Sequence, residues 1–386
     1  MTLITKPSST GASAGGADNR IRVMVVDDSA VVRGMMTRWL DEDARIHVAF
    51  AARNGRHAVD ELAKVDPDVV ILDVEMPEMD GLSALPLLLK AKLGLVVIMA
   101  STLTLRNAEI SLKALQLGAR DYVPKPESNA GLSGADDFKR EIVEKVTVLG
   151  ARARDRRMAR SGAPAGAGAR PTPAPIRATA AAAPGKFRPF SRMAPKVLTI
   201  GSSTGGPQAL MEVLRELKPV CMRMPVLITQ HMPPTFTAIL AEHLAKASGV
   251  PAREAVHNEQ VMPGTIYVAP GGRHMVIQRH GEQVTISLND EPPINFCKPA
   301  VDPLFDSVSK VYGASTLALV LTGMGADGAR GGVKIADAGR TVLVQDEASS
   351  VVWGMPGATY SAGAASAMLA LADIAPKISQ LCAGAR

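Results

Sequence analysis

The chain has 386 residues, of which 47% are hydrophobic but only 3% aromatic. This length suits two or three domains with buried cores, and the scarcity of aromatic rings argues against a surface that stacks on nucleic-acid bases. The net charge is +6, but ten Lys and Arg residues and a single Asp lie between residues 151 and 195. The basic excess therefore belongs to that segment, and the rest of the chain is slightly acidic.

The cysteines and the N-terminus indicate a cytoplasmic protein. Cys221, Cys297 and Cys382 are far apart and form no C-x-x-C pair, which argues against a disulfide framework or a zinc site. No apolar run reaches the length of a membrane span, and the first residues lack the pattern of a signal peptide. We expect no membrane insertion, and we interpret residues 1–20 as a disordered lead-in.

Residues 21–150 predict an N-terminal α/β domain. Five short apolar runs are expected to be strands, at 21–26, 46–51, 68–72, 95–99 and 121–123. The clearest helix covers 30–41, where large apolar side chains recur on one face. Short apolar strands that alternate with helices indicate a parallel sheet covered on both sides, and five such units predict a flavodoxin-like doubly wound domain.

Residues 151–195 consist mainly of Ala, Pro, Arg and Gly. They contain too few large apolar residues to pack, so we expect a flexible linker. Apolar residues at helical spacing just before it allow the preceding helix to continue into its first turns.

Residues 196–386 predict a second doubly wound α/β domain. The expected strands are 197–200, 226–229, 265–269, 317–321 and 341–344, and the expected helices are 207–217, 236–248, 301–311 and 329–338. Residues 275–278 and 284–288 predict an added hairpin around 279–281.

Acidic and polar side chains follow the predicted strands of the first domain. Asp27 and Asp28 end the first strand, Asp73 ends the third, and Ser101 and Lys125 follow the fourth and fifth. The carboxyl ends of parallel strands meet at one edge of a sheet, so these side chains should lie together. Three carboxylates repel one another unless a cation lies among them, and oxygen ligands suit Mg²⁺. An Asp beside Mg²⁺ can attack a phosphoryl donor, and the hydroxyl and ammonium groups can contact the product.

These residues resemble those of response-regulator receiver domains. The matching motifs are Val25-Val26-Asp27-Asp28-Ser29, Leu72-Asp73-Val74-Glu75-Met76-Pro77-Glu78-Met79-Asp80-Gly81 and Lys125-Pro126. The resemblance covers about residues 21–150. It implies that Asp73 is the phosphoacceptor and that Asp27, Asp28, Asp73 and the backbone carbonyl of Glu75 hold Mg²⁺.

The same resemblance implies that Ser101 and Lys125 contact the phosphoryl group. It also implies that Tyr122 is the aromatic residue that switches position. Without the resemblance, Tyr122 would be interpreted as a packing residue.

A serine, a histidine and an aspartate each follow a predicted strand of the second domain. Ser203 lies in the turn Gly201-Ser202-Ser203-Thr204-Gly205-Gly206-Pro207, near the start of a predicted helix whose N–H groups can stabilise an oxyanion. His231 and Asp327 follow the strands 226–229 and 317–321. The three should meet at one sheet edge as nucleophile, base and orienting carboxylate.

Other interpretations of these segments stay open on position alone. A glycine-rich turn after a strand often holds a phosphate, although no lysine follows at Walker spacing here. His257 and His274 are rival bases, and His243 lies within a predicted amphipathic helix, where a structural role is expected.

The second domain is similar to the chemotaxis protein-glutamate methylesterases over about residues 196–383. The motifs are Gly201-Ser202-Ser203-Thr204-Gly205-Gly206, Ile228-Thr229-Gln230-His231-Met232-Pro233-Pro234 and Leu321-Thr322-Gly323-Met324-Gly325-Ala326-Asp327-Gly328. The resemblance implies that Ser203, His231 and Asp327 form the triad, with Thr204 and the Met324 backbone near the oxyanion. It implies no cofactor in the esterase site.

The resemblance also implies partners. The substrates would be γ-glutamyl methyl esters, and often glutamines, on the cytoplasmic helices of chemoreceptors, and the phosphodonor would be a chemotaxis histidine kinase. We expect a monomer that binds no nucleic acid. One stretch departs from the family pattern Arg-His-Arg-Pro-Ser-Val-Asp, because Phe296-Cys297-Lys298-Pro299-Ala300-Val301-Asp302 stands in its place.

The order of the two domains predicts a switch in which the unphosphorylated receiver covers the esterase cleft and phosphorylation of Asp73 opens it. The alternative is a response regulator whose C-terminal domain binds a partner without catalysis. A DNA-binding output is disfavoured, because the second domain predicts strands and its folded part is not basic.

Overall fold

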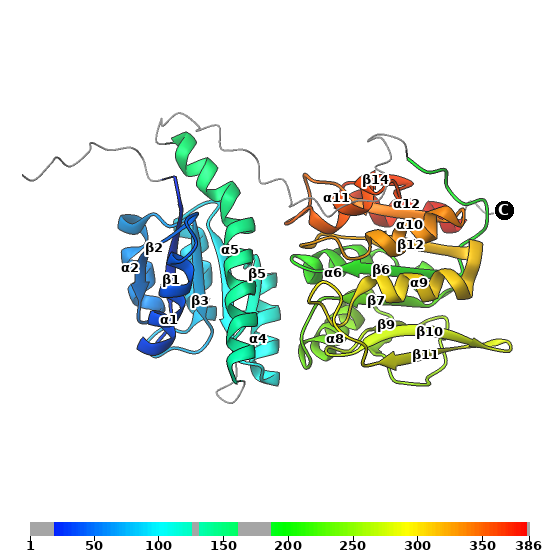
Figure 1. The fold of residues 1–386 in the computed structure, drawn as a ribbon, viewed down its shortest axis with the longest axis horizontal. Coiled ribbons are helices and arrows are strands. Elements are labelled where there is room, and N and C mark those ends of the chain that lie inside the picture. Colours follow the sequence, from blue (N-terminus) through cyan, green and yellow to red (C-terminus); the bar gives the residue numbers. More distant parts are fainter. Residues whose placement is uncertain (1–18, 126–130, 161–186, 384–386) are drawn as a thin grey trace, which may run out of the picture.

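The computed structural model describes residues 19–125, 131–160 and 187–383. They fold into two α/β domains that lie side by side, as Figure 1 shows. The expected lead-in falls mostly on residues 1–18, and most of the expected linker on 161–186, both outside the described residues. Within the described part, no helix is long and apolar enough to cross a membrane.

The N-terminal domain has five parallel strands in the order β2-β1-β3-β4-β5. The strands are β1 (Ile21–Val26), β2 (Ile46–Ala52), β3 (Val69–Asp73), β4 (Val96–Ser101) and β5 (Asp121–Pro124), and the helices are α1 (Ala30–Asp41), α2 (Gly55–Val65), α3 (Gly81–Ala91), α4 (Leu105–Gln116) and α5 (Gly131–Arg160). β3 and β4 are buried along their whole length, as expected for strands covered by helices on both faces. The flavodoxin-like fold predicted from the sequence is confirmed.

Helix α5 continues ten residues past the expected end of the domain. Ala153 and Met158 are buried, and Arg157 forms an ion pair with Asp68 at 3.0 Å. The first turns of the basic segment are therefore part of the N-terminal domain's surface, because an apolar stripe persists within the arginine-rich sequence.

The C-terminal domain has seven parallel strands in the order β14-β13-β12-β6-β7-β9-β8. These are β6 (Val197–Ser202), β7 (Val226–Gln230), β8 (Ala252–Glu254), β9 (Ile266–Val268), β12 (Thr316–Val320), β13 (Thr341–Gln345) and β14 (Ala367–Leu369). The antiparallel hairpin of β10 (His274–His280) and β11 (Gln283–Asn289) confirms the predicted insertion. The α/β fold is confirmed, with edge strands β8 and β14 that the sequence analysis did not predict.

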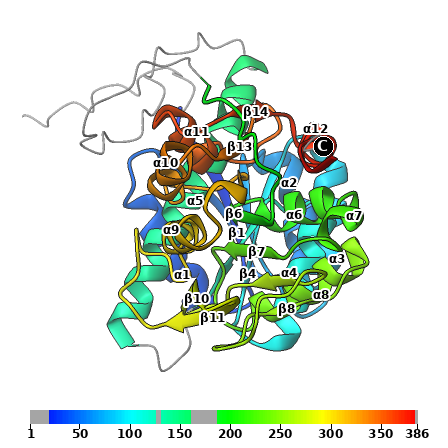
Figure 2. The ribbon, with the colours of Figure 1, turned by 90° about the vertical axis from the view of Figure 1, so that its right-hand side faces the viewer.

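Helices cover both faces of this sheet, as the end-on view in Figure 2 shows. They are α6 (Gly206–Arg215), α7 (Lys218–Cys221), α8 (Phe236–Ser248), α9 (Val301–Tyr312), the short 3₁₀ helix η1 (Gly313–Ser315), α10 (Ala329–Asp337), α11 (Gly354–Ser361) and α12 (Leu371–Ala383). Residues 187–195 form no helix or strand but lie against this domain, where the backbone N–H of Arg188 donates to the Ala365 carbonyl at 2.8 Å.

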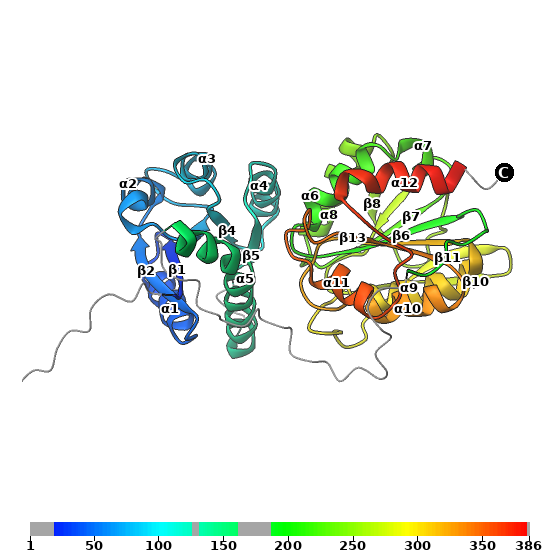
Figure 3. The same cartoon turned by 90° about the horizontal axis from the view of Figure 1, so that it is seen from above.

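The domains meet along α4, β5 and α5 of the first and the strand ends of the second (Figure 3). The ring of Tyr122 on β5 stacks on that of Phe236 at the start of α8, with centroids 4.6 Å apart and planes inclined by 10°. The interface thus lies at the end of the C-terminal sheet where the loops after β6 and β7 lie.

Candidate functional site

The acidic cluster of the N-terminal domain forms at the carboxyl ends of β1 and β3. Asp27, Asp28 and Asp73 each place one carboxylate oxygen within 4.8 Å of the others. The ammonium of Lys125 lies 2.6 Å from Asp27 Oδ2 and 2.7 Å from Asp73 Oδ1. One lysine cannot neutralise three carboxylates, so this donor set fits a divalent cation that prefers oxygen ligands.

Burial dominates the electrostatics of Asp73. Its desolvation and the nearby charge of Asp27 outweigh the opposing effect of Lys125 and raise the pKa of Asp73 to about 6. A cation bound here would favour the ionised, nucleophilic carboxylate.

Three further residues were predicted for this site, and they differ in burial and in their contacts. Ser101 is buried at the end of β4 and accepts a hydrogen bond from Ser111 Oγ at 3.1 Å. Tyr122 is buried in the domain interface. The side chain of Glu75 is exposed two residues after Asp73, and the metal-binding role of its carbonyl stays a prediction.

Ser203 lies in the loop between β6 and α6, where glycine is required at two positions. Gly205 has φ +76°, and a Cβ on Gly206 would lie 2.1 Å from Gln230 Oε1. The Gln230 amide holds this loop in place, because its Nε2 donates to the Ser203 carbonyl at 2.9 Å and its Oε1 accepts from Ser202 Oγ at 2.7 Å. Gln230 is therefore a positioning residue that the sequence analysis did not single out.

His231 follows β7 and pairs with Asp327, which follows β12. Nε2 of His231 lies 2.7 Å from Asp327 Oδ2, and the two side chains are only 10% and 2% exposed. Because Nε2 faces Asp327, Nδ1 is the ring nitrogen that remains available to the groups lining the adjacent cavity. Among the described residues, no hydrogen bond joins Ser203 Oγ to His231.

The start of α9 holds Asp327 in place. The backbone N–H groups of Val301 and Asp302 donate to its carboxylate at 2.6 and 3.0 Å. Burial raises the pKa of Asp327, but the hydrogen bond and charge of His231 and these N–H donors outweigh it and lower the pKa. Asp327 therefore stays ionised and can orient the imidazole.

A second buried carboxylate supports this arrangement. Asp302 accepts from the backbone N–H groups of Gly328 and Gly331 at 3.1 and 2.8 Å, and from Arg330 Nε at 2.8 Å. It thereby fixes the loop that carries Asp327. The sequence analysis quoted Asp302 only as part of an atypical stretch and missed this role.

The rival histidines have structural partners. His274 is fully buried, accepts from the Ala300 N–H at 3.1 Å and lies 3.1 Å from the Pro292 carbonyl. His257 accepts from the Leu288 N–H at 3.0 Å. Neither of them lines the cleft that contains Ser203 and His231.

That cleft has a volume of about 510 Å³ and is walled by both domains. Ser203, Thr204, His231 and Met324 line it from the C-terminal domain. The N-terminal domain contributes Asp121, Tyr122, Pro124, Arg140, Glu141, Glu144 and Lys145. The N-terminal domain therefore closes one wall of the cavity that Ser203 and His231 line.

A buried polar chain crosses the interface beside Ser203. Thr204 Oγ1 donates to Asp121 Oδ2 at 2.8 Å, and the same carboxylate oxygen lies 3.1 Å from the Lys145 ammonium. The charges of Asp121 and Glu141 outweigh burial and raise the pKa of Lys145, so it remains charged. The residue next to the proposed nucleophile is thus hydrogen-bonded to the other domain.

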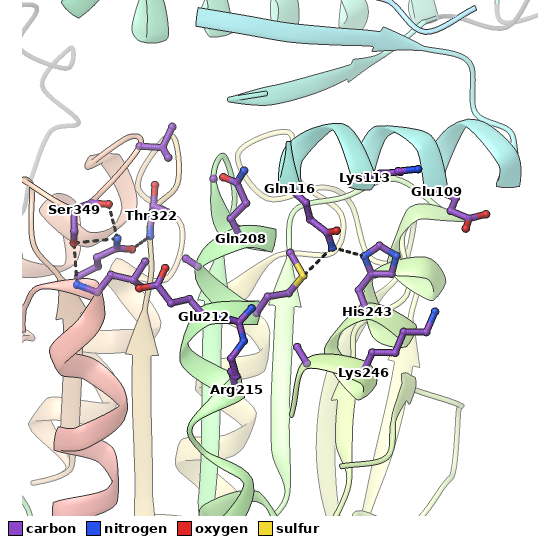
Figure 4. A pocket seen from close by; sticks show the side chains of 17 residues that line it. Glu109, Lys113, Gln116, Gln208, Glu212, Arg215, His243, Lys246, Thr322 and Ser349 are labelled. Carbon is purple, nitrogen blue, oxygen red and sulfur yellow. Dashed lines mark hydrogen bonds between the residues drawn. The ribbon is translucent and has the colours of Figure 1, made fainter. Parts of the chain in front are cut away.

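A second, larger cavity of about 1,080 Å³ lies between α4 and the helices α6 and α8 (Figure 4). Gln116 bridges it, with Nε2 3.2 Å from His243 Nδ1 and 3.5 Å from Met211 Sδ. The cavity contains none of the triad residues, so it belongs to the domain interface and not to the proposed chemistry.

Comparisons with known proteins agree with this two-domain geometry. Residues 198–378 match the family described as CheB methylesterase, and residues 23–135 match the response regulator receiver domain. The chain is 54% identical, over the full length of both proteins, to a "Protein-glutamate methylesterase/protein-glutamine glutaminase of group 2 operon" of Bradyrhizobium diazoefficiens. The chain belongs to the protein-glutamate methylesterase family.

Further relatives carry the same description. A protein-glutamate methylesterase/protein-glutamine glutaminase of Nitrobacter hamburgensis is 55% identical over 98% of this chain and 99% of its own. Among solved structures, the CheB methylesterase catalytic domain of Thermotoga maritima is 38% identical, covers 49% of this chain and 100% of its own, and has a TM-score of 0.47.

Proposed function

We propose that this protein is a phosphorylation-activated serine hydrolase that removes methyl groups from γ-glutamyl methyl esters of chemoreceptors and also deamidates receptor glutamines. The substrates are the methylated cytoplasmic helices of chemoreceptors, and a chemotaxis histidine kinase supplies the phosphoryl group. The protein acts in the cytoplasm as a monomer in chemotactic adaptation. The observation that carries the proposal is that His231, paired with Asp327, lines the same cleft as Ser203.

The proposed reaction uses Ser203 as nucleophile. Its Oγ attacks the ester carbonyl carbon while Nδ1 of His231 takes the hydroxyl proton. Backbone N–H groups near Thr204 and Met324 stabilise the oxyanion. The proton passes from His231 to the departing methoxy oxygen, methanol leaves, and water releases the glutamate by the same steps in reverse order. The esterase site needs no cofactor for this chemistry.

Phosphorylation acts at the N-terminal domain. Asp27, Asp28, Asp73 and the Glu75 carbonyl would hold Mg²⁺, which would supply positive charge at the site where the Asp73 carboxylate takes the phosphoryl group. Ser101 and Lys125 then contact the phosphoryl oxygens, and movement of Tyr122 is transmitted to the interface. The stacking of Tyr122 on Phe236 and the bond from Thr204 to Asp121 support an inhibitory docked state, because both would break when β5 moves.

The deciding experiment compares the wild type with Ser203→Ala. Methanol release from methylated receptor membranes is measured with and without Mg²⁺ and a small acyl-phosphate donor. We expect the donor to accelerate the wild type, and we expect Ser203→Ala to release methanol about 10³-fold or more slowly in both conditions.

Ser202→Ala removes only a hydrogen bond to Gln230, which positions the loop, so it separates disturbance of the loop from loss of the nucleophile and should lower the rate far less than Ser203→Ala. Asp73→Asn should keep the basal rate and lose the response to the donor. If Ser203→Ala released methanol as fast as the wild type, the C-terminal domain would be a binding module without this catalysis.

A further inference from the structure

His274, a rival of His231 as the base, has an environment that indicates a different role. It is the first residue of β10, its side chain is fully buried, and it does not line the cleft. Nδ1 accepts from the Ala300 N–H at 3.1 Å, and Nε2 lies 3.1 Å from the Pro292 carbonyl oxygen. A carbonyl oxygen can only accept, so Nε2 carries the proton and the ring is held as one neutral tautomer.

These two bonds hold both ends of a loop whose middle forms part of the cleft wall. Pro292 and Ala300 are the ends, and residues 295–298 between them line the cleft. The loop is also tied to the turn before β10, because the Gly272 N–H donates to the Lys298 carbonyl at 3.0 Å. One buried imidazole therefore fixes where this loop begins and where it ends.

The Ala300 end of the loop leads directly to Asp327. Ala300 is the buried N-cap residue of α9, and no side chain caps this helix. The next two backbone N–H groups, of Val301 and Asp302, donate to the Asp327 carboxylate, whose Oδ2 lies 2.7 Å from His231 Nε2. Alanine has no polar side chain with which to fix the helix start, so the direction of these N–H groups depends on how the imidazole holds Ala300.

The turn that precedes His274 is fixed against the loop that follows His231. A Cβ on Gly271 would lie 2.2 Å from the Pro234 nitrogen, so only glycine allows this close approach of the two backbones. The Gly271 N–H also donates to Thr237 Oγ1 at 3.0 Å. His274 thus joins the segment beside the proposed base to the helix start that holds the carboxylate partner of that base.

We infer that His274 is a positioning residue for the proposed hydrolysis. By holding the start of α9 against the turn before β10, it sets the place of Asp327 and, through Asp327, the orientation of the His231 imidazole. The inference rests on the proposed function, in which His231 is the base. A displaced Asp327 impairs proton transfer, so loss of this support should lower kcat.

Two substitutions separate the two bonds of this imidazole. The side-chain amide of asparagine reaches the place of Nδ1, so His274→Asn keeps an acceptor for the Ala300 N–H and loses the bond to Pro292. The amide of glutamine reaches the place of Nε2, so His274→Gln keeps a donor for Pro292 and leaves the Ala300 N–H without its acceptor. Each variant loses one buried hydrogen bond, so similar losses of stability are expected.

The test measures kcat and KM for methanol release from methylated receptor membranes by the phosphorylated full chain. We expect His274→Gln to lower kcat about 10- to 100-fold and His274→Asn to lower it less than about threefold. Thermal unfolding of both variants is measured in parallel. A purely structural role would lower kcat in proportion to the loss of stability, whereas a positioning role separates two variants of similar stability.

His257→Gln is the matched control. Nδ1 of His257 also accepts a backbone N–H, that of Leu288 on β11 at 3.0 Å, and the substitution removes this acceptor in the same way. The Leu288 N–H is not part of the helix start that holds Asp327, so kcat should stay within about twofold of the wild type.

A double-mutant cycle with Asp327→Ala shows whether His274 acts through Asp327. His274→Gln should change the residual rate of Asp327→Ala by less than about twofold, because the carboxylate that it positions is already absent. An equal loss in both backgrounds, or equal kcat values for His274→Asn and His274→Gln, would overturn the inference.

Ser203→Ala in the same assay keeps this inference distinct from the proposed function. If Ser203→Ala loses activity and the two His274 variants do not differ, only the positioning role is wrong. If Ser203→Ala releases methanol as fast as the wild type, the proposed hydrolysis is wrong, and the positioning role that rests on it is wrong as well.

Discussion

The glycine at position 206 shows how closely single residues are fitted around the proposed nucleophile. A Cβ there would collide with the Gln230 amide oxygen and would lie 2.8 Å from Ser202 Cβ. We expect Gly206→Ala to displace Gln230, which positions Ser203, and to lower methanol release by on the order of 10²-fold, as displacements of about 1 Å can do.

Gly34→Ala is the matched control for this substitution. Gly34 lies within α1, and an added Cβ would meet nothing within 4 Å. This variant should keep its activity and gain about 0.5–1 kcal/mol of stability, because alanine favours helix. If Gly206→Ala released methanol at the wild-type rate, the hydrogen bonds of Gln230 would not be needed to position Ser203.

The pH dependence of the esterase provides a second test at the scale of residues. The pKa of His231 is raised to about 10, although burial alone would lower it, so the imidazole keeps its proton through neutral pH. A general base must be neutral, and activity should therefore rise as pH increases through and above neutrality. Cys297→Ala removes one of the two groups that raise this pKa, so the rising limb should move to lower pH.

This profile is measured as methanol release with saturating acyl-phosphate donor, from about pH 6 to pH 10. The rate of Ser203→Ala at each pH is subtracted to remove spontaneous ester hydrolysis. An unchanged limb in Cys297→Ala would mean that Asp327 alone sets the basicity of His231.

At the scale of elements, helix α4 contributes a polar contact that should help to hold the domains together. Gln116, near its end, contacts His243 and Met211 across the larger cavity. A hydrogen bond of this kind contributes about 0.5–1.5 kcal/mol. We expect Gln116→Ala to raise the methanol release of the unphosphorylated chain about two- to tenfold by favouring the open state.

Phosphorylated chains serve as the control, because their cleft is already open and Gln116→Ala should then have no effect. A variant whose unphosphorylated rate equals that of the wild type would show that α4 does not restrain the esterase.

The elements also show what the sequence could predict. Strands β3 and β7 lie in the interior of their sheets and form short, fully buried and mainly apolar runs, which the sequence pattern predicts well. The edge strands β8 and β14 have three residues each and are only partly buried, and such short segments carry no distinct periodicity. Helix α11 contains Gly354, Pro356 and Gly357, which do not favour a helix by themselves.

The residues of the proposed sites likewise divide into those that the sequence could predict and those that it could not. The sequence analysis predicted that Ser203, His231 and Asp327 lie near one another, because each follows a predicted strand. The carboxyl ends of parallel strands meet at one edge of a sheet. Gln230, Asp302 and Asp121 act through contacts between segments far apart in the chain, and a single sequence carries no signal for such contacts.

At the scale of the whole molecule, the C-terminal domain begins earlier than expected. The guanidinium of Arg188 donates to the Gly363 carbonyl and to Asp337, each at 2.8 Å, and the Ser191 N–H donates to Thr341 Oγ1 at 3.0 Å. A chain that begins at residue 196 lacks these bonds. We expect it to unfold several degrees below a chain that begins at residue 187, as measured by thermal denaturation.

Methanol release of the chain that begins at residue 187 tests the inhibitory docking directly. It should exceed that of the unphosphorylated full chain and should not respond to the acyl-phosphate donor. If it were no more active than the unphosphorylated full chain, inhibition by the receiver would be wrong.

Among the described residues, the two domains meet through a stacked ring pair, hydrogen bonds, a cation–π contact and shared apolar packing, and they belong to one polypeptide. Such a covalent connection gives each domain an effective concentration around its partner that is typically in the millimolar range for short flexible tethers. Contacts too weak to hold two separate proteins together can therefore keep the cleft closed within one chain. The fraction of closed molecules is then independent of how many copies a cell contains. A cell could change the abundance of this enzyme without changing the sensitivity of each molecule to phosphorylation.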